Sequence, residues 1–588
     1  MKFNERMLRV VVLVVFAVVF ISLTVTSYMQ KSATWDEPQH LIAGYNALRF
    51  HDYRTDPEHP PFLRMWAALP LLVTSDVHMD VAVIDRIDPV SWINSGQFMY
   101  CPGFLFRAND ADRLLYRARF MITLLGVLLG ILIFTWAREW LGFWPATVAL
   151  AGYCLEPNLL AHAGLVTTDF GVACFIFGSL YFAWRTARCL NWPNLTGLTV
   201  FFALAVVSKF SAVLLGPIVL MLLAVRACRN TPWRCRIVGD VDILSRARRA
   251  LVAVGLMALL TAAAWASVWA VYGFRYSPSA SPDWSFRLSQ EPAAIARTPL
   301  LTRLVAWVDA RRLLPNAFSQ GFLVGQARAK VRPTFLAGRH SLTGWWYYFP
   351  AAFLIKTPIA FIILVGAGLV ARVRHRRTAL ENELFIVLPI AVYFAAAITQ
   401  HLNIGLRHIL PIYPLALLLM AAGVAEFLRT RRKAALVMLG FLGAFWVWEF
   451  ARVCPDYLTF FNQFVGGPRN GYRYLVDSNL DWGQDLKPLK QWLNKRGVGS
   501  INLAYFGTAD PAYYDIQYTR LPSGPLFAES LSQAPQLPGY VAVSATLLMG
   551  VYLDNTAQAF YRPFLQHEPA ARIGNSIHVY WVEKPWWR

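Results

Sequence analysis

Long apolar runs recur along most of the chain, and they constrain its fold more than any other feature. An α-helix needs about 20 apolar residues to cross a bilayer, and about eleven runs approach or reach that length. They lie at about 8–29, 117–137, 144–161, 170–186, 195–208, 210–226, 250–272, 349–371, 383–399, 409–428 and 434–451. Apolar residues make up 56% of the 588 residues and charged residues only 15%, too little polar surface for a soluble domain. The sequence therefore predicts a mainly α-helical, polytopic membrane protein.

Basic residues orient these runs. The net charge is +21, and most of the excess lies in short loops that share one side if every run spans. These loops contain Lys2, Arg6 and Arg9; Arg138; Arg185 and Arg188; and residues 226–249, 372–377 and 429–433. Such loops are typically cytoplasmic, which explains the charge without a nucleic-acid partner. The first run lacks a small-residue cleavage site, so we expect a retained anchor with a cytoplasmic N-terminus.

The remaining segments fall on the outer side. We predict a first outer loop at 30–116 and a long outer loop at 273–348 within a membrane module of residues 1–451. Residues 39–50 and 62–74 have helical apolar spacing and are interpreted as amphipathic helices lying along the membrane. From 452 to 588, strand-like pieces at 500–506, 540–544 and 577–582 accompany a polar helix at 486–495. This pattern predicts a small α/β domain outside the membrane. The seven cysteines show no CxxC or Cys/His spacing, so no zinc site or disulfide framework is predicted.

Acidic residues and histidines crowd the first outer loop. Asp36 and Glu37 follow the first apolar run directly, and His40 lies one helical turn further on. Partial burial at such an interface can make one acid a general base, whereas the competing interpretation is a helix cap. Glu58 and His59 stand in a proline-rich stretch that is either a stiff loop or the edge of a site. Two adjacent residues are a weak metal signal.

Four further charges adjoin apolar runs on the same predicted face. Arg64 follows the proline-rich stretch, and Asp169 opens an apolar run, where it is an N-cap or a site residue. Lys209 separates two runs and either faces an internal polar site or snorkels to the interface. Arg407 lies at the outer end of another run, where its guanidinium suits a phosphate or a carboxylate. Acids that activate a hydroxyl and cations that hold a phosphate would together complete a site.

Four motifs resemble the C-type glycosyltransferase superfamily, in particular the group of protein O-mannosyltransferases and lipid A aminoarabinose transferases. They are Asp36-Glu37, His59-Pro60-Pro61, Thr168-Asp169 and Lys209. The resemblance implies transfer of a sugar from a polyprenyl phosphate carrier, such as undecaprenyl phosphate, to an acceptor outside the cytoplasm. The mannosyltransferase pattern continues into Leu-Gly-Lys, whereas Phe62-Leu63-Arg64 follows here, and no inserted repeat modules are found. Residues 478–485 (SNLDWGQD) and 505–511 (YFGTADP) look like the tail of bacterial relatives whose acceptors are undefined.

The resemblance also implies roles. Asp36 would be the general base of a single displacement with inversion, and Lys209, Arg407 and Arg64 would stabilise the departing phosphate. Glu37 and Asp169 would orient hydroxyl groups or hold Lys209 and Asp36 in place.

Three residues would form the substrate pocket or support it, namely Glu58, His59 and His40. We predict no metal, although Glu58 and His59 would take a divalent cation in relatives that use one. The expected partners are the lipid-linked sugar, membrane lipid and an acceptor that is a protein, lipid or glycan. The expected location is a bacterial inner membrane with the site and C-terminus in the periplasm.

Two other classes of function compete. A transporter or flippase of lipid-linked sugars would also need intramembrane charges and many spans, but the sequence shows no inverted repeat. A non-catalytic subunit that scaffolds envelope assembly through its C-terminal domain is the third hypothesis.

Overall fold

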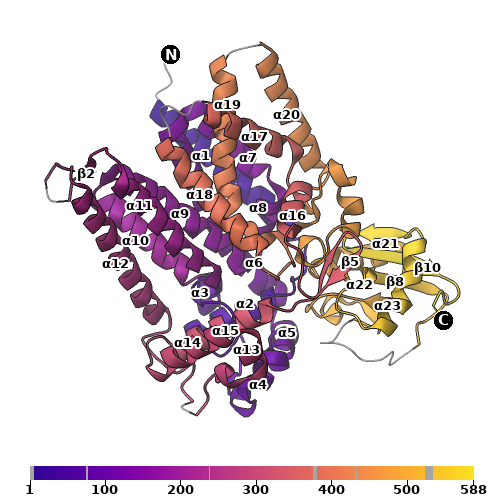
Figure 1. Cartoon of the computed structure of the whole chain (residues 1–588). Helices are drawn as coiled ribbons and strands as arrows, with labels where there is room; N and C mark the ends of the chain where they lie inside the picture. The colour runs from indigo at the N-terminus through magenta and orange to yellow at the C-terminus, as the bar shows by residue number, and fades with distance from the viewer. Residues whose placement is uncertain are drawn as a thin grey trace.

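The computed structural model describes residues 5–74, 77–237, 239–281, 283–374, 380–430, 433–523 and 534–587. Helices make up most of the molecule, and the C-terminal sheet, drawn in yellow in Figure 1, lies to one side of them. The basic runs predicted at 372–377 and 429–433 lie partly outside the described residues.

Seven helical segments in the described part of the chain are long and apolar enough to cross a membrane. They are α1 (Glu5–Tyr28), α6 (Ala111–Leu141), α9 (Thr168–Arg188), α11 (Leu215–Cys228) with the short turn before it, α12 (Arg246–Val271), α19 (Ile412–Thr430) and α20 (Lys433–Ala451). Shorter apolar helices follow the predicted runs at α10 (Trp192–Val206) and α18 (Leu380–Ile398). The predicted mainly α-helical, polytopic fold is confirmed.

Two predicted spans are interrupted. The run at 144–161 divides into α7 (Phe143–Cys154) and α8 (Pro157–Ala163), and the run at 349–371 divides into α16 (Tyr348–Lys356) and α17 (Ile359–Arg374). The second pair is bent by 113°. A proline stands at each interruption, Pro157 and Pro358, and proline disfavours helical geometry in the residue before it. The predicted count of about eleven spans treated both runs as continuous helices. Among the described residues, seven helical segments, or eight if the bent pair is one span, are long and apolar enough to cross a membrane.

Exposure differs sharply among the long helices. In the most apolar stretch of α9, 89% of the residues are buried, whereas the corresponding share is 17% for α1 and 22% for α12 and α20. A helix that is apolar on all sides and exposed in an isolated chain is surrounded by lipid in the membrane. Helix α9 therefore lies at the centre of the bundle, while α1, α12 and α20 present apolar surface at its periphery.

The first outer loop forms α2 (Glu37–Phe50), α3 (Phe62–Ala68) and α5 (Gln97–Ala108). Helices were predicted at 39–50 and 62–74, but α2 is buried over residues 37–47 and is not apolar along one face alone. Gly44 explains the close packing, because a Cβ there would lie 2.0 Å from the carbonyl oxygen of Arg64. This packing fixes α2 against the start of α3.

The long outer loop contains α13 (Pro292–Arg297), α14 (Pro299–Ala310), α15 (Asn316–Ala329) and a hairpin of β4 (Thr334–Leu336) and β5 (Arg339–Ser341). The C-terminal strands form a sheet in the order β7-β6-β8-β10-β9. Their bounds are β6 (Ser500–Ala504), β7 (Gln517–Arg520), β8 (Gly539–Ser544), β9 (Ala571–Ile573) and β10 (Ile577–Val582), and α21 (Leu486–Arg496) precedes them. Strand β6 runs parallel to β7 and β8, and the other pairs are antiparallel. The division at residue 451 and the side of the membrane stay predictions.

The C-terminal region is bonded directly to the chain around Asp36. The backbone N–H of Ser32 donates to Gln484 at 2.9 Å, and that of Trp35 donates to Trp482 at 2.8 Å. The residues that precede α2 are therefore held by segment 478–485, far away in the sequence.

Candidate active site

Asp36, Arg407, Asp169 and Lys209 form a chain of alternating charge. The Nη1 of Arg407 donates to Oδ2 of Asp36 at 2.7 Å and lies 3.6 Å from Oδ2 of Asp169. Lys209 Nζ pairs with the other oxygen of Asp169. The structure thus brings together four charged residues that the sequence placed on one face, from segments distant in the chain.

Local breaks in the helices position these side chains. Asp169 lies in the first turn of α9, where a carboxylate is favoured by the helix dipole. Lys209 occupies the extended break between α10 and the next turn, and Arg407 lies in a short 3₁₀ turn at Leu406–Ile409 that precedes α19. Charged groups can therefore project from irregular backbone inside the bundle, which is where such backbone is tolerated in a membrane.

The four side chains differ in accessibility. The side chains of Asp169, Arg407 and Lys209 are 2%, 10% and 11% exposed, whereas that of Asp36 is 27% exposed. Burial opposes ionisation of Asp36, but Arg407 and, more weakly, His40 outweigh it and hold the pKa of that carboxyl below its usual range. Asp36 is therefore an ionised carboxylate and the most accessible acid of the cluster.

Several buried polar atoms around the cluster have no hydrogen-bond partner among the described residues. They include Nε of Arg407, Oγ1 of Thr168, Nδ1 of His59 and Nε2 of His408. Leaving such a group unpartnered typically costs about 1–3 kcal/mol, and a bound ligand or water is the usual explanation. Burial, with Lys209 and Arg407 adding to it, holds the pKa of His408 well below its usual range, so this imidazole is neutral. The cluster therefore offers unused polar groups to a polar ligand.

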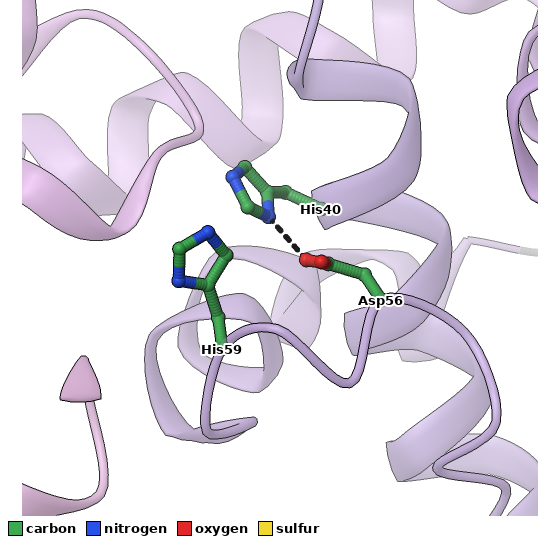
Figure 2. A group of neighbouring side chains, drawn as sticks. All are labelled: His40, Asp56 and His59. Atoms are coloured by element: carbon green, nitrogen blue, oxygen red, sulfur yellow. Dashed lines mark hydrogen bonds and ion pairs between the residues drawn. The ribbon is translucent and has the colours of Figure 1, made fainter. Parts of the chain in front are cut away.

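His40, Asp56 and His59 form a second group (Figure 2). The Nδ1 of His40 is 2.9 Å from Oδ2 of Asp56, and the two imidazole rings are 5.1 Å apart. One ligand atom from each residue can be chosen so that all three lie within 4.8 Å of one another. Two histidines and a carboxylate are a donor set for a divalent transition metal. However, Nη1 of Arg64 also lies 3.1 Å from the oxygen of Asp56 that contacts His40, so Asp56 already belongs to an ion-pair network, whereas Nδ1 of His59 has no partner among the described residues.

The charges of this network depend on burial. Burial raises the pKa of Asp56, but the charge of Arg64 and the hydrogen bond with His40 act against it, and the pKa lies well below its usual range. Burial lowers the pKa of His59 to about 3, although Asp56 acts in the opposite direction. Asp56 is thus ionised and His59 neutral. Asp56 also has a positive φ of 50°, which fixes the sharp turn that carries His59.

Glu37 points away from the cluster. Its carboxylate accepts hydrogen bonds from Arg119 Nε at 2.8 Å and Nη2 at 2.5 Å, and from the backbone N–H groups of Thr34 and Val166. The side chain is fully buried. The sequence interpretation in which Glu37 orients substrate hydroxyls has no support in this geometry, because its oxygens are already occupied.

Arg64 and Glu58 also have local partners. Arg64 donates to the backbone carbonyls of Thr55, Asp56 and His59, and Glu58 forms an ion pair with Arg328 of α15. These contacts hold the proline-rich turn in place, and they leave Arg64 less free for a phosphate than Lys209 or Arg407.

Three residues at or near the site were not singled out from the sequence. Arg119 lies in an apolar run, where a buried charge is itself a signal. His408 is adjacent to Arg407, and Trp482 belongs to segment 478–485. The indole of Trp482 lies under the guanidinium of Arg407, 4.2 Å from ring centroid to Cζ. Its contribution depends on tertiary packing and has no local sequence signal.

Comparison with known proteins supports the resemblance. Residues 113–238 match the family model described as dolichyl-phosphate-mannose-protein mannosyltransferase, and this range includes Asp169 and Lys209. The resemblance to the C-type glycosyltransferases is thus confirmed for this part of the membrane region. No curated protein sequence matches the chain.

Solved structures of similar shape include an archaeal oligosaccharyltransferase and a bacterial ArnT. The oligosaccharyltransferase of Archaeoglobus fulgidus in the apo form is 14% identical, with a TM-score of 0.43, over 76% of this chain and 55% of that chain. ArnT of Cupriavidus metallidurans bound to undecaprenyl phosphate is 13% identical, with a TM-score of 0.45, over 96% and 97%. The chain thus spans little more than half the length of the archaeal protein.

Proposed function

We propose that this chain is a membrane glycosyltransferase that transfers a sugar from a polyprenyl phosphate-linked donor to an acceptor hydroxyl. The observation that carries the proposal is the alternating row of Asp36, Arg407, Asp169 and Lys209, surrounded by unpartnered polar atoms. The family match over Asp169 and Lys209 supports the same class. We further propose that the site faces the periplasm of a bacterial inner membrane, because the basic loops fall on the opposite side.

Asp36 is the general base of the proposed reaction. It is ionised and is the most accessible acid of the cluster. In the resting chain Arg407 neutralises it. When the donor phosphate binds, Arg407 pairs with a second anion, and its ion pair with Asp36 weakens. The pKa of the Asp36 carboxyl then moves back towards its ordinary range. The base becomes stronger only when the donor is in place.

The chemical step is a single displacement. The acceptor oxygen bonds to the anomeric carbon as the bond from that carbon to the phosphate oxygen breaks, and the hydroxyl proton passes to Asp36. The configuration inverts, and no protein nucleophile is needed because phosphate is already a leaving group. Lys209 and Arg407 stabilise the negative charge that grows on it, each by roughly 1–4 kcal/mol at a separation of about 4 Å. Asp169 holds both cations in position, and Glu37 with Arg119 holds the backbone before Asp36.

A flippase or transporter of lipid-linked sugars is the second candidate. The observation in its favour is the bent pair α16 and α17, since broken helices commonly line transport sites. Against it, the cluster is built from breaks in other elements, and only one such bent pair occurs among the described helices.

The deciding experiment uses the purified full-length protein with a panel of radiolabelled polyprenyl phosphate sugars and crude envelope extract as acceptor. Both transfer and hydrolysis to free sugar are scored. We expect Asp36→Asn to lower donor consumption by at least about 100-fold, the low end for loss of a general base. The matched control is Asp80→Asn, because Asp80 is an exposed helix-capping acid of the same loop and asparagine caps equally well. If no variant consumes donor and the wild type moves lipid-linked sugar across vesicles, the chain is a flippase.

A further inference from the structure

A cavity of about 300 Å³ lies between α5 of the first outer loop and the edge of the C-terminal sheet. Phe98, Met99 and Arg107 of α5 line one wall. Strand β7 with Tyr518 and the loop that contains segment 505–511 line the other. The cavity is therefore formed by two parts of the chain that are about 400 residues apart, and none of the proposed catalytic residues lines it.

The loop wall of this cavity is fixed by the two C-terminal motifs. The hydroxyl of Tyr505 donates to the carbonyl of Gly483 at 2.5 Å. Gly483 has a φ of +90°, and a Cβ there would lie 2.8 Å from the Cα of Gly507. Segments 478–485 and 505–511 thus pack with backbone against backbone. A wall that is fixed in this way is suited to a pocket that exists before its ligand binds.

The cavity adjoins the proposed base. Thr508, which lines it, donates its hydroxyl to the backbone carbonyl of Trp35 at 2.9 Å, and Trp35 immediately precedes Asp36. The Trp35 ring also stacks on Phe506, with 4.9 Å between the centroids. A molecule in the cavity is therefore separated from the peptide before Asp36 by a single side chain.

The cavity lining combines apolar or aromatic surface with hydrogen-bonding groups. Phe98, Met99 and Tyr518 offer apolar or aromatic surface, and Met99 is 72% exposed. Arg107 and Asp510, with Nε and Oδ2 3.8 Å apart, offer charged donors and acceptors at the opening. Sugar rings present C–H groups on their faces and hydroxyls around their rim, so they match this mixture. A prenyl chain would make no use of these hydrogen-bonding groups, and an extended peptide needs a long groove with backbone contacts instead of a compact cavity.

We propose that this cavity binds a sugar unit of a glycan acceptor. The proposal rests on the proposed function only in identifying the bound saccharide as the acceptor of sugar transfer. The binding of a saccharide itself can be measured without any donor. It gives the C-terminal region a task, which is to hold the acceptor hydroxyl beside Asp36.

The test measures binding to the purified full-length protein in lipid nanodiscs by saturation-transfer NMR. The probes are methyl glycosides of common hexoses and N-acetylhexosamines, together with a short peptide that contains serine and threonine. Met99→Trp fills the cavity from an exposed position that tolerates size, and Tyr518→Ala removes an aromatic wall. The matched control is Leu565→Trp, at a site that is 44% exposed and outside the cavity lining.

We expect at least one glycoside to bind the wild type and Leu565→Trp, and Met99→Trp and Tyr518→Ala to weaken this binding by about tenfold or more. Binding of the peptide alone, binding of no glycoside, or glycoside affinity unchanged in Met99→Trp would overturn the proposal. Donor consumption without glycoside binding would contradict this inference and leave the proposed function standing. Glycoside binding without donor consumption would contradict the proposed function and leave this inference standing.

Discussion

The guanidinium of Arg407 lies against the indole of Trp482, 4.2 Å from the ring centroid. One residue precedes a membrane helix and the other belongs to the C-terminal segment, so this contact joins the two halves of the molecule at the proposed phosphate site. The same guanidinium donates a hydrogen bond to Asp36 through Nη1. Trp482 is therefore positioned to hold Arg407 in the orientation that reaches both the base and the donor.

Replacing Trp482 by leucine should raise the KM for the lipid-linked donor. A cation–π contact contributes about 0.5–2 kcal/mol, which corresponds to roughly a 2- to 30-fold change. Trp482→Phe should restore part of the loss, because it keeps an aromatic face. Donor titrations measure the effect, and Trp581→Leu, at an exposed tryptophan of β10, is the control. Equal effects of leucine and phenylalanine at 482 would rule out this contact.

Lys209 should contribute mainly to the rate. Its ion pair with Asp169 places a cation inside the bundle, where charge is costly unless it has a function or a partner. We expect Lys209→Met to lower kcat by about tenfold or more, since the departing phosphate loses one of its two cations. Lys209→Arg should retain more activity because it keeps the charge. Single-turnover rates at saturating donor measure this step, and a change confined to KM would assign Lys209 to ground-state binding.

Glu37 should matter for folding and not for chemistry. Glu37→Gln leaves Arg119 fully buried without its counter-ion, and breaking a buried pair costs about 3–5 kcal/mol. The variant should unfold at lower temperature in detergent, while its folded fraction keeps a donor KM close to that of the wild type. A large fall in kcat with unchanged stability would instead show that Glu37 acts on substrate.

The contrast between Asp36 and Glu37 marks the limit of sequence reasoning. Apolar runs show where charges meet the membrane surface, so Asp36, Asp169, Lys209 and Arg407 were expected on one face, and the structure brings their side chains together. Neighbours in sequence leave a helix start in different directions, however. Glu37 binds Arg119, 82 positions later, and Asp36 binds Arg407, 371 positions later. Such pairings depend on how helices pack, and a local pattern does not contain that information.

The helix interruptions could have been predicted more closely. Pro157 and Pro358 stand inside runs that we interpreted as continuous spans, and proline removes a backbone donor. Hydrophobic content dominated that interpretation. In the structure, Glu156 accepts from the N–H of Asn158 at the start of α8, and Glu449 accepts from the N–H of Ile359 at the start of α17. Buried acids thus satisfy the backbone at both interruptions.

Asp481 should make the C-terminal region less stable as the pH rises. Burial raises its pKa to about 8. The negative charges of Asp485 and Asp477 act in the same direction, whereas the hydrogen bonds from Thr546 act in the opposite direction. The folded state therefore binds the proton more tightly than the unfolded chain, and this stabilisation is lost as the pH rises from about 4 to about 8. Asp481→Asn should be more stable than the wild type at pH 8, with a difference that shrinks towards pH 5, changing by at most about 1.4 kcal/mol per pH unit. Thermal unfolding midpoints across this range measure it, and parallel pH profiles would contradict it.

Two glycines of α15 provide a matched test of the turn that carries Asp56 and His59. A Cβ at Gly321 would lie 1.8 Å from the carbonyl oxygen of Pro57, whereas at Gly325 the nearest atom is the carbonyl oxygen of Glu58 at 3.9 Å. Gly321→Ala must displace this turn, and a shift of about 1 Å near reacting groups can cost about 100-fold in rate. Gly325→Ala makes the same chemical change without the clash and should behave as the wild type. Donor consumption and the unfolding midpoint of both variants measure the difference. Equal activity in the two would show that the turn of Asp56 and His59 does not position the proposed active site.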